Sequence, residues 1–88
     1  MKKTTVTITG SDGLGPIAAT LLSSYCSKYH SNCTAEYNGR EANMKAIMPT
    51  VLLFVPDKKE ITISCEGDDE DAAIEEIEAF MRSRGIIA

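Results

Sequence analysis

Residues 60–71 have the sequence EITISCEGDDED, in which a strand pattern gives way to a helix start. The first seven residues alternate between polar and apolar, and this two-residue period predicts a half-buried β-strand with Ile61, Ile63 and Cys65 inward. Gly67 ends the predicted strand. The four acidic residues that close the stretch favour the positive end of a helix dipole, so we expect the last helix to begin among them.

The segment after the acidic run is typical of an amphipathic helix, because its apolar residues recur at spacings of three and four. Arg82 and Arg84 would lie at the negative end of this helix, and Gly85 would stop it. We expect its buried stripe to be Ala73, Ile74, Ile77, Phe80 and Met81. The acidic run is therefore explained as a helix start without a bound ligand.

Toward the N-terminus, residues 4–9 alternate with the same period and predict a strand with Val6 and Ile8 inward. A glycine-rich break follows. Pro16 is then well placed as the first residue of a helix, because its missing N–H would have no partner there. We expect this helix to extend to about Tyr29. Its apolar stripe would consist of Ala18, Ala19, Leu22, Cys26 and Tyr29.

The middle of the chain predicts a hairpin followed by a short helix. Residues 33–37 are typical of a strand, Asn38-Gly39 is a strong turn signal, and residues 40–43 form the returning strand. Between residues 45 and 55 we expect a short helix, with Pro49 tolerated only in its first turn. The resulting order, βαββαβα, predicts an α+β fold with helices on one face of an antiparallel sheet.

Length and charge limit the classes of function. The 88 residues suffice for a single domain over positions 1–88 with one modest core. No apolar run reaches the roughly 18–20 residues of a membrane span, and Lys2 and Lys3 precede no signal-peptide core, so we expect a cytoplasmic protein without a membrane role. The net charge is −4, and eight acids without a base lie between Glu66 and Glu78, which disfavours nucleic-acid binding.

The three cysteines are an odd number and form no C-x-x-C pair, so we expect buried, reduced thiols that pack as small apolar residues. Cys26, His30 and Cys33 do have ligand-like spacing, and Cys65 would complete a tetrahedral zinc site. All three cysteines fall on inward positions, however, so we expect no metal and no cofactor. A disulfide between Cys33 and Cys65 is conceivable, but it is not expected in a reducing cytoplasm.

Several of these segments resemble HPr, the small phosphocarrier of the bacterial sugar phosphotransferase system. The similar segments are Asp12-Gly13-Leu14 with Ala18-Ala19, Asn38-Gly39 with residues 42–45, and residues 61–70. The similarity extends over essentially the whole chain. It implies an open-faced β-sandwich, in which three helices cover one face of a four-stranded antiparallel sheet, and a protein that is not an enzyme.

The resemblance also implies three functional positions, and this chain departs from the family at each. The histidine that takes the phosphoryl group from enzyme I corresponds to Gly15. The arginine that helps to hold that group corresponds to Ile17, and the regulatory serine of Gram-positive HPr corresponds to Ala46. Pro16 has no N–H to offer a phosphate at the helix start. We therefore expect an HPr-like regulatory or adaptor module that is not phosphorylated, with no catalytic residues.

In HPr the start of the first helix and the short helix form the apolar patch that docks enzyme I, sugar permease domains, the kinase and a transcription regulator. The corresponding residues here are Leu14, Gly15, Pro16, Ile17, Ile47 and Met48. An exposed apolar patch is costly unless something covers it. We expect this surface to bind another protein or, without a partner, a second copy of the chain.

Two other functions remain open from the sequence. A phosphocarrier with a substitute acceptor would use Ser11, Thr20 or His30. A cysteine-based redox or metal protein is the other alternative. The glycine-rich segment at residues 10–15 lacks the lysine and the glycine spacing of known phosphate-binding loops, so we interpret it as a turn before a helix.

Overall fold

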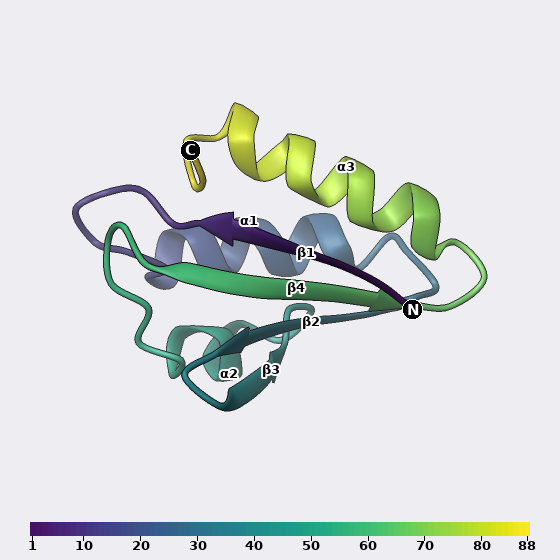
Figure 1. Ribbon diagram of the computed structural model, residues 1–88, viewed down its shortest axis with the longest axis horizontal. Coiled ribbons are helices and arrows are strands. Elements are labelled where there is room, and N and C mark those ends of the chain that lie inside the picture. The colour runs from purple at the N-terminus through teal and green to yellow at the C-terminus, as the bar shows by residue number, and fades with distance from the viewer.

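In the computed structural model, which describes residues 1–88, three helices cover one face of a four-stranded antiparallel sheet (Figure 1). The strand order is β1-β4-β2-β3. In chain order the elements are β1 (Lys2–Thr7), α1 (Pro16–Cys26), β2 (Asn32–Tyr37), β3 (Arg40–Asn43), α2 (Ile47–Val51), β4 (Glu60–Glu66) and α3 (Glu70–Ser83). This α+β open-faced sandwich confirms the predicted fold class. None of the helices combines the length and the apolar character that a membrane crossing requires.

The central strand β4 pairs with β1 on one side and with β2 on the other. Its alternation is the predicted one: Ile61, Ile63 and Cys65 are buried, whereas Thr62 and Ser64 are half-buried on the uncovered face. The neighbours of Thr62 and Ser64 in the register are polar too, namely Thr5, Lys3, Glu36 and Thr34. Strand β4 therefore presents apolar side chains to the helices and polar side chains to the open face.

The β2–β3 hairpin turns at Asn38 and Gly39, as predicted. Asn38 has φ 56° and Gly39 has φ 81°, so both residues lie in the left-handed region that a two-residue type I′ turn requires. This turn fixes the register of the two strands, and Tyr37 pairs with Arg40 beside it.

The helices begin near the predicted residues. Helix α1 starts at Pro16 and ends at Cys26, earlier than expected, although Tyr29 is still buried in the turn beyond it. Helix α3 starts at Glu70, and its stripe is confirmed, with Ala73, Ile77 and Met81 fully buried and Ile74 and Phe80 packed against the core.

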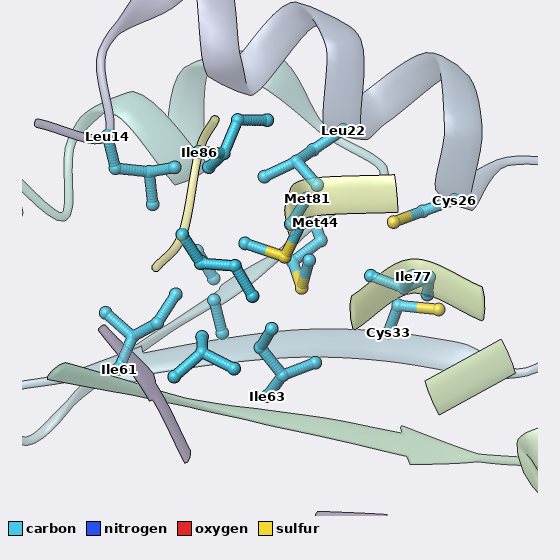
Figure 2. Packing of buried hydrophobic residues seen from close by; sticks show 14 of the residues in the cluster. Leu14, Leu22, Cys26, Cys33, Met44, Ile61, Ile63, Ile77, Met81 and Ile86 are labelled. Carbon is cyan, nitrogen blue, oxygen red and sulfur yellow. The ribbon is translucent and has the colours of Figure 1, made fainter. Parts of the chain in front are cut away.

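One core fills the space between the sheet and the helices (Figure 2). Leu22 and Cys26 enter it from α1, Ile77 and Met81 from α3, and Ile61 and Ile63 from β4. All three cysteines are buried, as predicted.

The last residues return to the first strand, a feature that the sequence analysis did not predict. Ile87 bridges to Ile8 in an antiparallel sense, and the Thr9 N–H donates to the Ile86 carbonyl over 2.9 Å. Ile86 and Ile87 are buried. The end of α3 is thereby held beside the loop that precedes α1.

Candidate functional site

The loop over residues 10–15 is anchored to the segment that follows α2. The Gly10 N–H donates to the Asp57 carboxylate over 3.0 Å, and the Leu14 N–H donates to the Val55 carbonyl over 2.9 Å. Gly13 has φ +60°, and a Cβ there would lie 2.1 Å from the Val55 oxygen. Only glycine fits this close approach. The loop thus joins the start of α1 to the chain beyond α2.

Leu14 was predicted to lie on the surface, and this prediction is wrong. Its side chain is only 2% exposed and belongs to the core, into which it points in Figure 2. The physical reason is the backbone bond to Val55, which ties this part of the loop down onto the core. Leu14 therefore supports the start of α1 from below and is not part of the exposed surface.

The start of α1 presents no reactive side chain. Gly15 is the N-cap residue, with extended backbone and no side-chain cap, and Pro16 is the first helical residue. Ile17, the next residue, is 77% exposed. The sequence predicted these three positions on the surface, and the structure places them together there. A Cβ on Gly15 would lie 3.3 Å from the Asp12 carbonyl oxygen, so a side chain fits after a small adjustment.

Helix α2 is short and exposes its first two side chains. Ile47 is exposed, and Met48 is 63% exposed. Thr50 is buried instead, because its hydroxyl donates to the carbonyls of Ala46 over 2.9 Å and Asn43 over 3.3 Å. The hydroxyl of Thr50 is therefore engaged inside the protein.

Two exposed apolar residues beyond α2 were missed by the sequence analysis. In the apolar run after Pro49, Leu53 and Val55 are buried, whereas Leu52 and Phe54 are exposed, Phe54 by 67%. The signal was the run itself: at a surface connection, successive side chains point in different directions, so part of a continuous apolar run remains outside. Phe54 also has a left-handed backbone, with φ 53°.

These exposed apolar side chains lie at the start of α1, in α2 and just beyond α2, and the two helices contact each other. We call this set of residues the docking surface, after the role that we propose for it below. Its residues are Pro16, Ile17, Ile47, Met48, Leu52 and Phe54. Two hollows of about 410 Å³ each flank Pro16. Arg84 lines the first hollow and Phe54 lines the second.

The three substitute phosphate acceptors lie in different places. Ser11 is exposed in the loop before α1 and lines both hollows. The Thr20 hydroxyl donates to the Pro16 carbonyl over 2.8 Å. His30 lies beyond the opposite end of α1, where its Nδ1 is 3.7 Å from an Asp68 carboxylate oxygen. It is therefore remote from the start of the helix.

The structure does not assemble the zinc pattern considered from the sequence. The cysteine thiols lie in the core, whereas the His30 side chain is exposed. His30 instead lies near Asp68 and Asp69, with one ligand atom from each within 4.8 Å of the others. The Asp69 carboxylate already accepts hydrogen bonds from the backbone N–H groups of His30 and Ser31 and from the Ser31 hydroxyl.

Residues 2–83 match the family described as the PTS HPr component phosphorylation site. The chain belongs to the HPr family. It is thus a member of the phosphocarrier family of the phosphotransferase system, as the resemblance implied. The solved structures that resemble this chain also have the HPr fold.

A histidine-containing phosphocarrier protein from mycoplasma is 34% identical, with a TM-score of 0.93 and 98% of each chain covered. HPr-C-His from Thermoanaerobacter tengcongensis is 32% identical, with a TM-score of 0.88, over 94% of this chain and 93% of that one. The catabolite repression protein Crh of Bacillus subtilis, an intertwined dimer with a swapped domain, is 28% identical. Its TM-score is 0.75, with 94% and 95% of the two chains covered.

Proposed function

We propose that this protein is a regulatory or adaptor member of the HPr family, which binds another protein and does not carry a phosphoryl group. The observation that carries the proposal is Gly15 at the start of α1. In the resemblance to HPr this position corresponds to the phosphoacceptor histidine, and glycine has no side-chain atom that could take the phosphate.

Two neighbours support the same proposal. The backbone N–H groups at a helix start ordinarily help to bind phosphate, and Pro16 has none. Ile17 supplies an apolar side chain at the position of the phosphate-holding arginine. Three chemical requirements of phosphoryl transfer, a nucleophile, a backbone donor and a cation, are therefore missing from three successive residues.

We also propose that the protein escapes the kinase that modifies HPr. The N-cap residue of α2, Ala46, corresponds to the regulatory serine and has no hydroxyl. Thr50 does not replace it, because its hydroxyl is buried and hydrogen-bonded to backbone carbonyls.

The exposed docking surface supports a binding role. Apolar surface buried in an interface contributes about 25 cal/mol per Å², less the cost of association. We propose as partner a protein of the phosphotransferase system or of carbohydrate regulation, in the cytoplasm. The likeness to Crh, a catabolite repression protein that is 28% identical, supports a regulatory role because a protein of this fold already serves regulation.

The direct test is incubation with enzyme I and phosphoenolpyruvate, followed by intact mass measurement, with an ordinary HPr in the same tube as the positive control. We expect the control to gain one phosphoryl group, about 80 Da, and this protein to gain nothing. An acid-labile gain on this protein would contradict the proposal.

A phosphocarrier with a substitute acceptor is the second candidate, favoured by the exposed Ser11 beside the start of α1. Peptide mapping in the same experiment separates the two functions. Phosphate on Ser11, Thr20 or His30 would establish this second function, whereas an unmodified chain that binds enzyme I would support the adaptor role.

A further inference from the structure

Two of the three buried cysteines face each other across the middle of the sheet. In the β2–β4 register, Cys33 lies directly opposite Cys65. Their sulfur atoms are 3.9 Å apart. Neither thiol is used by the docking surface, so the proposed function does not account for this pair.

The backbone pattern identifies the kind of strand pair that the two cysteines form. The Met44 N–H donates to the Cys33 carbonyl over 2.8 Å, so the peptide groups of Cys33 face β3 and point away from β4. Cys33 and Cys65 are therefore a non-hydrogen-bonded pair, whose Cα atoms lie about 4.5 Å apart. This separation is within the range of about 4.4–6.8 Å that a disulfide spans.

We propose that Cys33 and Cys65 are an oxidative modification site, at which a hydroperoxide converts the two thiols into a reversible cross-strand disulfide. The backbone already has the required separation. Rotation of the two side chains then brings the sulfur atoms from 3.9 Å toward the bond length of about 2.05 Å.

The reaction balances with hydrogen peroxide as the oxidant. The Cys33 thiolate attacks one peroxide oxygen and breaks the O–O bond, which leaves a sulfenic acid and a hydroxide that takes up a proton to become water. The Cys65 sulfur then attacks the Cys33 sulfur, and the departing hydroxyl takes the Cys65 proton and leaves as a second water. The two thiols lose two electrons and two protons, and the peroxide gains them.

The surroundings of the two thiols favour these roles. Hydrogen bonding from Cys26 stabilises the Cys33 thiolate, with a further contribution from Cys65, and lowers the pKa of Cys33 to about 7. Burial raises the pKa of Cys65 to about 12. Cys33 is thus the thiol that ionises first and reacts with the peroxide.

Cys26 approaches Cys33 from α1 at the same end of the core (Figure 2). The neighbouring Cys33 thiol and burial both raise the pKa of Cys26, so Cys26 stays protonated beside the Cys33 thiolate. The three sulfur atoms do not all lie within 4.8 Å of one another, the spacing that a shared metal ion would need. Disulfide formation therefore fits this geometry better than metal binding.

The turn at His30 and Ser31 lies next to the Cys33 thiol. The Cys33 sulfur lies 3.7 Å from the Ser31 carbonyl oxygen. Asp69 holds this turn through three hydrogen bonds, all to His30 and Ser31. Because Cys33 is only 1% exposed, we infer that hydrogen peroxide reaches its thiol when this turn opens.

The experiment treats the native protein with hydrogen peroxide at neutral pH and counts its thiols after denaturation. We expect alkylatable thiols to fall from three to one, with a mass loss of about 2 Da that dithiothreitol reverses. Trypsin separates the three cysteines, because it cleaves after Lys28, Arg40, Lys59 and Arg82. The expected cross-linked product joins residues 29–40 to residues 60–82 and leaves Cys26 free.

Variants provide the matched controls. Cys26→Ala should still lose 2 Da, whereas Cys33→Ala and Cys65→Ala should not. A link from Cys26 to Cys33, a disulfide between two chains, or three reduced thiols in the peroxide-treated wild type would each overturn the proposal. The wild-type peptide map decides the matter even where a variant does not fold.

Discussion

Gly15 places no side chain at the start of α1 and leaves the helix geometry intact. Its backbone is extended rather than left-handed, and its carbonyl accepts the Ala19 N–H over 2.9 Å. A residue with a side chain is therefore permitted there. The proposed loss of phosphoryl transfer is therefore attributed to the missing side chains and not to a change in the helix. Substitutions that restore those side chains can test it.

Gly15→His should restore little phosphorylation by enzyme I. The histidine fits, since its Cβ would lie 3.3 Å from the Asp12 carbonyl, but Pro16 still lacks an N–H and Ile17 still lacks a guanidinium. We expect the double variant Gly15→His/Ile17→Arg to gain acid-labile phosphate faster than the single variant. Intact mass against time measures both. Equal rates in the two variants would show that Ile17 is irrelevant to the loss.

The charged carboxylate of Asp69 stabilises the turn at His30 and Ser31. The Ser31 hydroxyl and the backbone N–H groups of His30 and Ser31 lower the pKa of its carboxyl from 3.8 to about 2. Because the folded-state pKa is depressed, the stabilisation is fully present above about pH 4 and is lost as the pH falls through 2. We expect wild type to melt above Asp69→Ala at pH 7, with the difference narrowing between pH 4 and pH 2. A constant difference over that range would contradict the role of the carboxylate.

Helix α2 depends on where its proline lies. Pro49 is its third residue, and the first four N–H groups of a helix have no partner inside the helix. The sequence therefore predicted a short helix that tolerates Pro49, and the structure confirms it. Beyond α2, the backbone of Phe54 lies in the left-handed region, with φ 53°. A bulky side chain in this backbone region is strained.

Phe54→Gly should stabilise the protein by about 0.5–1 kcal/mol, because glycine adopts the left-handed backbone without a Cβ penalty. Phe54→Ala is the matched control: it removes the same ring but keeps the penalty, so we expect no such gain. Urea unfolding of the three proteins measures the difference. Equal midpoints for the glycine and alanine variants would show that the backbone at this residue is not strained. If Phe54 also contacts the partner, both variants should bind more weakly.

For the molecule as a whole, we expect substitutions in the docking surface to change partner binding without changing the free energy of unfolding. Its side chains are exposed, so their replacement should leave the fold intact. We expect Ile17→Glu and Met48→Glu to weaken binding to enzyme I or another partner at least about tenfold, with unfolding free energies within about 0.5 kcal/mol of wild type. Titration calorimetry and thermal melts measure the two effects.

Ser24→Glu is the matched control, because Ser24 is also exposed on α1 but lies outside the docking surface. It adds the same charge and should bind normally. Should the protein instead pair with itself, light scattering would show a dimer that Ile17→Glu dissolves and Ser24→Glu leaves intact. Normal binding by both docking-surface variants would remove the main support for an adaptor role.

The elements could be predicted from the sequence because each has a local period. The alternation of Ile61 and Ile63 and the helical spacing of Ala73 and Ile77 are set by neighbours along the chain. Contacts between distant segments have no such signal. The bond from Leu14 to Val55 is one example, and it turned an expected surface residue into a core residue. The bridge from Ile8 to Ile87 is another.

The polar open face of the sheet has a consequence for how the gene tolerates mutation. Along β4, helix-facing and open-face side chains alternate, and only the former meet a packed environment. In a saturation mutagenesis library selected for folded protein, fitness should therefore oscillate with a period of two. Polar substitutions should be purged at Ile61 and Ile63 and should accumulate at Thr62 and Ser64. Such a library would trace the two faces of the sheet without any structural measurement, and a uniform profile would mean that the open face is covered in the cell.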